Sequence, residues 1–301
     1  MKHSGHSGVK VSMKNVVISV LVLTFLFSVT VCSSAASGNN TSGLLRYPVV
    51  LVHGIAAHDR ESRIDYWGRI PETLRGYGVE VFFGNTDSWG SFESNASILK
   101  KTIGDILAQT GHERVNIIAH SKGGLDSRYL IWRYNFGDRV ASLTTISTPH
   151  HGAELADFIY EQGIIHTPMA RHFLEVLGQL FADQQPDLFR VLQQLTSVNM
   201  KNFNEKVQKD ERVYYQSLFT VMNKSIDDLV FFSTFLYLRR VSGPNDGMVS
   251  ERSATWGNNS RRIAEGVSHR QIIDIGWQNV IDTDITSLYV DIIHGLAVKG
   301  F

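Results

Sequence analysis

The chain contains 301 residues, has a formal net charge of zero, and consists of 43% hydrophobic residues. This length is long for one domain, but it fits a single large α/β domain that carries an insertion. A nucleic-acid-binding protein would need a basic face, and the balanced charge gives no indication of one. The chain has one cysteine, Cys32, so no disulfide can form within it.

The first 36 residues have the layout of a secretory signal peptide. Lys10 and Lys14 precede the uncharged apolar run at 16–31, and the small residues SSAAS that follow resemble a cleavage site. A transmembrane helix usually needs about 20 apolar residues, so a retained anchor fits this run less well. We therefore expect secretion after cleavage near Ala36, no stable transmembrane insertion, and a polar linker at 37–45.

Cys32 lies directly after the apolar run, which leaves a lipoprotein signal as an alternative. A small residue is expected before a lipid-modified cysteine, but Val31 stands there instead. Anchoring through Cys32 is therefore the weaker alternative to release of the mature chain.

Six apolar segments are predicted to form strands. The first, YPVVLVHG at 47–54, is a continuous apolar run that ends at glycine. The others lie at 77–85, 115–119, 139–148, 212–220 and 262–269. Apolar residues between them recur at helical spacing, as in ASILKKTIGDIL at 96–107. Continuous apolar strands that alternate with helices predict an α/β fold with a mostly parallel central sheet flanked by helices.

One long segment, at about 152–210, interrupts this alternation. Its apolar residues form two helical series, one within 173–181 and one within 188–195. They predict an inserted helical lid or cap, although packing on the sheet is the default for any amphipathic helix. A further apolar stretch, LVFFSTFLYL at 229–238, favours contact of this part of the surface with lipid or an apolar substrate.

The stretch VNIIAHSKGGLDSRYL at 115–130 places polar residues where an apolar strand turns into a helix. A nucleophilic serine needs a general base within reach and an exposed position on a tight turn with small neighbours. Ser121 meets the second requirement, because Ala119 and Gly123 lie two residues before and after it. Ala119 departs from the usual glycine but is still small. We predict Ser121 as the nucleophile and leave the role of His120 open.

A strand, a nucleophile elbow and a helix are typical of an α/β-hydrolase, in which the acid and then the histidine follow the nucleophile in the chain. Among the later histidines, only His269 follows a late strand within a loop, so it is the predicted base. His294 lies in a predicted C-terminal helix. His150 and His151 could line the site, but they precede every candidate acid.

The predicted acid is Asp246, in the turn sequence SGPNDGMVS between the fifth strand and His269. Its carboxylate would hold the imidazole in the correct tautomer and stabilise its charged form. Turn formation alone would also explain Asp246, because Pro-Asn-Asp-Gly is a strong turn signal. Asp227 and Asp228 are rival acids, but they open an apolar helix, where capping is a sufficient role.

Backbone amides are expected to stabilise the oxyanion of the tetrahedral intermediate. One amide is that of Lys122, the residue after the nucleophile. The other is that of Ile55, in the loop after the first strand. Side-chain identity matters little for such donors, so isoleucine and lysine are both acceptable.

Several of these motifs occur together in one protein family. In combination, VVLVHGIAA, DYWGRIPETLRGYGVEVF, VNIIAHSKGGLDSRYL, ISTPHHGAELADFI and PNDGMVS resemble the true lipases of bacteria, which are secreted α/β-hydrolases that cleave triacylglycerols and related esters. The resemblance covers about 47–157 and 241–275. It implies the same triad and the same oxyanion-hole residues, with the inserted helices acting as a mobile lid over an apolar acyl pocket.

The resemblance also raises the question of a metal. Many of these lipases bind a structural calcium partly through an aspartate two residues after the catalytic histidine, and here that position is Gln271. A hard cation prefers anionic oxygen ligands, so we do not expect the calcium site to be kept. No close spacing of histidine and aspartate indicates zinc either. We predict that no metal or other cofactor is required.

The sequence thus predicts a secreted serine carboxylester hydrolase. The preferred interpretation is a triacylglycerol lipase of the EC 3.1.1.3 type that acts at an oil–water interface. An esterase, phospholipase or polyester hydrolase with the same triad is the alternative. A non-catalytic binding protein on this scaffold would be expected to lack at least one triad residue, and all three are present.

Overall fold

The computed structural model describes residues 44–55, 66–161, 183, 186–277, 280 and 283–301. The predicted signal peptide, most of the predicted linker and the first helical series of the predicted insertion lie outside these residues. Within the described ranges, no helix combines the length and the apolar character needed to span a membrane.

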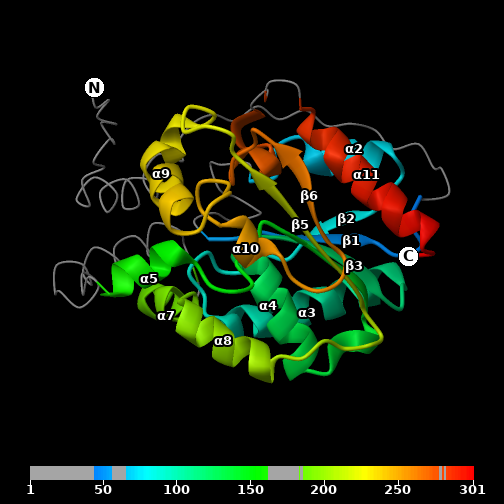
Figure 1. Cartoon of the computed structure of the whole chain (residues 1–301). Helices are drawn as coiled ribbons and strands as arrows, with labels where there is room; N and C mark the ends of the chain where they lie inside the picture. The colour runs from blue at the N-terminus through cyan, green and yellow to red at the C-terminus, as the bar shows by residue number, and fades with distance from the viewer. Residues whose placement is uncertain (1–43, 56–65, 162–182, 184–185, 278–279, 281–282) are drawn as a thin grey trace, which may run out of the picture.

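In the described part of the chain, six strands form one sheet (Figure 1). They are β1 (Val49–Val52), β2 (Val81–Phe83), β3 (Val115–His120), β4 (Val140–Ile146), β5 (Tyr214–Val221) and β6 (Ser260–Glu265). Their spatial order is β2-β1-β3-β4-β5-β6, and every neighbouring pair is parallel. The predicted fold class is confirmed.

At two of the predicted strands, a turn that contains a glycine limits the length of the strand. Tyr77 is the C-cap of helix α2 (Ile70–Gly76), and Gly78 follows with a φ of 77°, so β2 begins only at Val81. At the other edge of the sheet, Gly266 has a φ of 73°, and β6 ends one residue before it. Both glycines adopt a backbone conformation that side-chain-bearing residues rarely enter.

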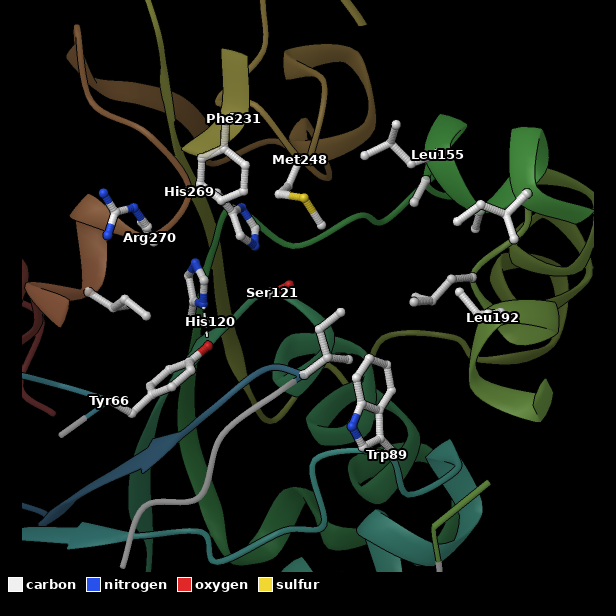
Figure 2. Close-up of a pocket in the computed structure, with 16 residues that line it drawn as sticks. Tyr66, Trp89, His120, Ser121, Leu155, Leu192, Phe231, Met248, His269 and Arg270 are labelled. Carbon is white, nitrogen blue, oxygen red and sulfur yellow. Dashed lines mark hydrogen bonds between the residues drawn. The ribbon is translucent and has the colours of Figure 1, made fainter. Parts of the chain in front are cut away.

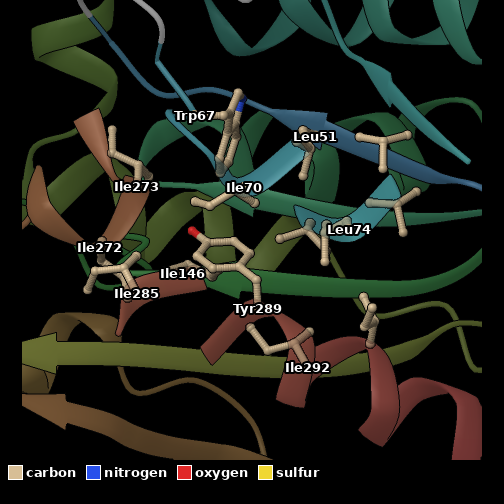
Figure 3. Packing of buried hydrophobic residues seen from close by; sticks show 14 of the residues in the cluster. Leu51, Trp67, Ile70, Leu74, Ile146, Ile272, Ile273, Ile285, Tyr289 and Ile292 are labelled. Carbon is tan, nitrogen blue, oxygen red and sulfur yellow. The ribbon is translucent and has the colours of Figure 1, made fainter. Parts of the chain in front are cut away.

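Alternation along the strands produces a separate apolar layer on each face of the sheet. Val49 and Leu51 join the cluster under α2 and α11 (Ile285–Val298), which Figure 3 shows around Trp67, Ile70 and Tyr289. The next residues along β1, Val50 and Val52, join the cluster under two other helices. These are α3 (Phe92–Thr110) and α4 (Lys122–Arg133).

The described helices of the predicted insertion are α5 (Glu154–Glu161), α7 (Leu188–Gln194) and α8 (Ser197–Lys206). They lie side by side at one end of the molecule and form a third apolar cluster with Trp89, Phe92 and Leu125 (Figure 1). The second predicted helical series therefore forms a helix, and its buried residues share this cluster with residues near the starts of α3 and α4. The movement of this insertion as a lid stays a prediction.

The remaining elements are short. The apolar stretch at 229–238 forms the 3-10 helix η3 (Leu229–Phe231) and most of α9 (Phe232–Val241). The others are η1 (Phe136–Asp138), α10 (Glu251–Ala254), η4 (Gln271–Ile273) and η5 (Ile275–Trp277). The site residues follow β1, β3, β5 and β6, so they meet at the carboxyl edge of the sheet, where parallel α/β folds form their sites.

Candidate active site

Ser121 lies on the tight turn between β3 and α4, as the sequence predicts. Its backbone φ is 53° and ψ is −130°, a strained conformation for a residue with a side chain. The turn is held because the Ser121 amide donates to Ile146 O at 2.9 Å and Thr148 Oγ1 donates to Ser121 O at 2.7 Å. A Cβ at Gly123 would lie 2.7 Å from Val52 O, so close packing of α4 on β1 requires glycine there.

Asp246 and His269 form a buried pair. Nδ1 of His269 lies 2.8 Å from Oδ2 of Asp246, and the His269 amide donates to Asp246 O at 2.8 Å. The other oxygen, Oδ1, accepts from the amides of Met248 at 3.0 Å and Val249 at 2.8 Å. Asp246 therefore both shapes its turn and orients the imidazole. Because Asp246 contacts Nδ1 of His269, the other ring nitrogen, Nε2, is the one that can transfer a proton.

The other candidate acids and histidines have different partners. Asp228 accepts from Val230 N, which caps η3 as expected, and it also binds Arg270. His150 is fully buried, contacts Thr145 and Arg128, and stacks on a tryptophan. His294 lies on the exposed side of α11, at the opposite face of the sheet from α4.

Ser121 and His269 line one pocket whose wall is mostly apolar (Figure 2). The apolar lining includes Ile55, Trp89, Ala153, Leu155, Ala156, Ile159, Leu192, Leu195, Phe231, Met248 and Ile273. These side chains come from the loops at the sheet edge, from α5 and α7, and from η3 and η4. The pocket therefore joins the reactive groups to an apolar surface that spans the core and the insertion.

The two predicted oxyanion-hole residues lie on either side of Ser121: Ile55 is in the loop after β1, and Lys122 is the first residue of α4. Ile55 lines the pocket, and a Cβ on the preceding Gly54 would lie only 2.7 Å from Ser121 Cβ. The Lys122 side chain is buried away from solvent, where Nζ contacts Asp126 at 2.8 Å. Only the backbone of Lys122 is thus left to act in the site, and its donor role stays a prediction.

A tyrosine and a histidine complete the site in a way that the sequence did not predict. Tyr66 Oη accepts from the Gly54 amide at 2.8 Å and contacts His120 Nδ1 at 2.7 Å. The His120 ring lies 4.4 Å from the His269 ring, measured between centroids. Burial and the neighbouring His269 hold the pKa of His120 well below its ordinary value, so His120 is neutral. The only sequence signal was that Tyr66 belongs to one of the lipase-like motifs.

The residues near Gln271 do not fit a calcium ion. Gln271 Oε1 accepts from Ser268 N at 2.8 Å, and its Nε2 donates to Asp227 O at 3.2 Å. Both carboxylate oxygens of Asp228 are engaged by protein donors, including the Arg270 guanidinium. Across the described residues, no group of three histidine, cysteine or acidic side chains could hold a metal. Independence of a metal stays a prediction.

With this geometry in place, the chain can be compared with known proteins. Residues 48–258 match the family model described as palmitoyl protein thioesterase. Triacylglycerol lipase 2 of Saccharomyces cerevisiae is 31% identical over 261 residues, which cover 79% of this chain and 75% of that protein. A triacylglycerol lipase of Burkholderia plantarii is 34% identical over 201 residues, which cover 62% of this chain and 55% of that protein. The chain thus spans about half the length of this bacterial relative.

Solved structures share the fold. The mature lipase BlEst2 of Bacillus licheniformis has a TM-score of 0.64 at 21% identity and covers 87% of this chain and 96% of its own. The lipase of Staphylococcus hyicus has a TM-score of 0.66 at 19% identity, covering 87% and 98%. Fold and site therefore define an α/β-hydrolase of the lipase and esterase type. The chain belongs to the palmitoyl protein thioesterase family within this class.

Proposed function

We propose that this protein is a secreted serine carboxylester hydrolase that cleaves acylglycerol esters, that is, a triacylglycerol lipase. The observation that carries the proposal is that Ser121 and the Asp246-bound His269 line the same apolar pocket. A serine and an oriented imidazole supply the chemistry of acyl transfer, and the apolar wall suits a fatty-acyl chain.

The reaction follows from the roles of the described groups. Ser121 Oγ attacks the ester carbonyl while His269 Nε2 takes the serine proton, and the Asp246 carboxylate stabilises the resulting imidazolium. The carbonyl oxygen becomes an oxyanion, for which the amides of Ile55 and Lys122 are the proposed donors. His269 then protonates the leaving alcohol, and the acyl group stays on Ser121. Water activated by His269 releases the fatty acid in the second half of the cycle.

Exposed apolar residues beside the pocket support a substrate at an oil–water interface. Ile226, Leu229 and Phe232 are 61%, 73% and 40% exposed, although all three are large and apolar. Phe231, within the same segment, is buried and lines the pocket. Exposed apolar side chains that adjoin a residue of the pocket favour an insoluble ester, because an aggregated lipid can cover them.

A second candidate function is hydrolysis of fatty-acyl thioesters, which the family match over 48–258 favours. The acyl-enzyme on Ser121 would be the same, and only the leaving group would change from an alcohol to a thiol. Matched oxygen esters and thioesters of the same fatty acid separate the two functions. A kcat/KM for the oxygen ester at least equal to that for the thioester supports the lipase, and a strong preference for the thioester contradicts it.

Export is proposed on the layout of residues 1–36, with cleavage near Ala36 and with lipid anchoring at Cys32 as the alternative. The mass of the mature N-terminus tests both. A mass that begins at residue 37 supports release, whereas a diacylglyceryl adduct on Cys32 supports anchoring.

The catalytic proposal is tested by Ser121→Ala, with Ser97→Ala on the exposed side of α3 as the matched control. We expect Ser121→Ala to lower kcat on a triacylglycerol emulsion by about 10³-fold or more and to abolish labelling by an organophosphonate. Ser97→Ala should leave both unchanged. Ester hydrolysis that survives in Ser121→Ala would contradict the proposal.

A further inference from the structure

We propose that Arg270 and Asp228 are positioning residues that hold the loop of His269. In this arrangement the Arg270 guanidinium supplies a positive charge that a metal ion could otherwise supply. This inference rests on the proposed function, because it concerns the placement of the base in that reaction. It starts from the hydrogen bonds of the residues on either side of His269.

Both neighbours of His269 bind one carboxylate. Ser268 Oγ donates to Asp228 Oδ2 at 2.7 Å, and Arg270 donates from Nε to Oδ2 at 2.6 Å and from Nη2 to Oδ1 at 3.0 Å. Two parallel bonds from one guanidinium fix direction as well as distance. The backbone at His269 is therefore held from both sides by Asp228, which lies 41 residues earlier in the chain.

Gln271 closes the same loop with two further bonds. Its side-chain oxygen accepts from Ser268 N, and its side-chain nitrogen donates to Asp227 O. Residues 268–271 are thus tied to each other and to the Asp227–Asp228 turn. These bonds use the amide side chain that stands where a calcium-binding aspartate would be expected.

Burial makes the positive charge of Arg270 necessary. The Asp228 side chain is 1% exposed and the Arg270 side chain is 21% exposed. A buried carboxylate without a cation is strongly unfavourable. Removing Arg270 therefore leaves the Asp228 carboxylate unpaired, and the loop must move so that water can reach it. Lysine would keep the charge but could not form the two parallel bonds.

Arg270 acts through His269 and does not reach the reacting atoms. In Figure 2 its guanidinium points away from Ser121, although the rest of the residue contributes to the pocket lining. His269 itself is held on its other side by Asp246, through both its ring and its backbone amide. Two buried carboxylates, Asp246 and Asp228, therefore determine where the imidazole lies relative to Ser121.

The test compares Arg270→Gln and Arg270→Lys with a control, Arg262→Gln. Arg262 lies on β6 and binds Glu251 of α10 and Glu265. Three properties are measured: kcat and KM on a water-soluble short-chain ester, the melting temperature, and the downfield proton resonance of the His269–Asp246 hydrogen bond. Active sites are counted with an organophosphonate, so that kcat refers to folded enzyme.

We expect Arg270→Gln to lower kcat about tenfold with KM within about twofold, because misplacement of a reacting group by less than 1 Å is costly. Its downfield resonance should shift or broaden. Arg270→Lys should give an intermediate kcat, and it carries the test if Arg270→Gln does not fold. Arg262→Gln should lower the melting temperature but leave kcat and the resonance unchanged.

Two results would overturn the proposal. One is an Arg270→Gln variant that loses thermal stability but keeps the wild-type kcat and resonance, which would make the ion pair merely structural. The other is a wild-type enzyme that loses activity on chelation and regains it with calcium. Failure of the proposed function is distinguishable, since Ser121→Ala would then still hydrolyse the ester.

Discussion

The two halves of the proposed triad are held in place by different means. Around Ser121, the backbone is fixed by close packing: the β3–α4 turn is strained, and α4 approaches β1 at a glycine. Around His269, the loop is fixed by charged side chains, namely Asp246 and the Arg270–Asp228 pair. The nucleophile should therefore be sensitive to side-chain volume, and the base should be sensitive to charge.

The largest effect is expected from the charge of Asp246. Asp246→Asn keeps an oxygen for the amides of Met248 and Val249 but removes the charge that supports the imidazolium, so kcat should fall about 10³- to 10⁴-fold. The control is Asp187→Asn, at a carboxylate that caps α7. Steady-state kinetics on a soluble ester measures both. A loss below tenfold would mean that the base does not depend on this charge.

The Ser121 side is tested by Gly123→Ala, paired with Gly104→Ala. A methyl group at Gly123 meets Val52 O and His53 O, so we expect about 1–3 kcal/mol less stability and roughly tenfold lower kcat. At Gly104, in α3, a Cβ meets nothing within 4 Å, and alanine should stabilise the helix by up to about 1 kcal/mol. Urea unfolding and kinetics measure the two effects. Equal stability and equal kcat in the two variants would contradict a role of close packing at Gly123.

Acid should destabilise the fold through two buried histidines. Burial, helped by His269 and Arg128 respectively, lowers the pKa of His120 and of His150 well below the usual value. The unfolded chain takes up protons at these positions near pH 6.5 while the folded chain does not, so stability falls as the pH decreases below about 6.5.

The expected slope is about 1.4 kcal/mol per pH unit for each histidine. His120→Gln should reduce the measured slope between pH 6 and pH 5 by about 1 kcal/mol per pH unit. The wild-type chain gives the reference slope. Denaturant unfolding at several pH values gives both slopes, and an unaltered slope in His120→Gln would show that His120 is protonated in the folded enzyme.

The smallest effect concerns the exposed segment beside the pocket. Leu229→Ser should lower activity on a triacylglycerol emulsion about threefold while activity on a soluble ester stays unchanged, since only adsorption to lipid is weakened. Val298→Ser is the control, because Val298 is 90% exposed but lies at the end of α11. Equal losses in the two variants would argue against a specific lipid contact at Leu229.

The sequence was sufficient for features that depend on local order. Strand and helix periods predicted the parallel sheet, and the small residues around Ser121 predicted the strained turn, because both depend on neighbours within a few positions. The contact of Asp246 with His269 followed from the order of residues in α/β-hydrolases. The movement of the insertion, the signal peptide and the absence of a required metal stay predictions.

Pairings between distant residues could not be predicted in the same way. Asp228 had a sufficient local role as a helix cap, and it does cap η3, so its bonds to Arg270 left no separate signal. Tyr66 and His120 are 54 positions apart and meet only in the folded chain, where β1, which precedes Tyr66, pairs with β3, which ends at His120. Such contacts depend on three-dimensional register, which spacing along one chain does not encode.

The hydrogen bond from the Gly54 amide to Tyr66 orders part of the site before a substrate binds. Tyr66 Oη joins the amide of one loop to the imidazole beside the nucleophile, so the Gly54 end of the oxyanion loop is fixed before any ester arrives. The entropy lost in ordering this end is then lost once, when the chain folds, and not again in each catalytic cycle. Binding of a transition-state analogue should accordingly require no slow rearrangement at the Gly54 end of this loop.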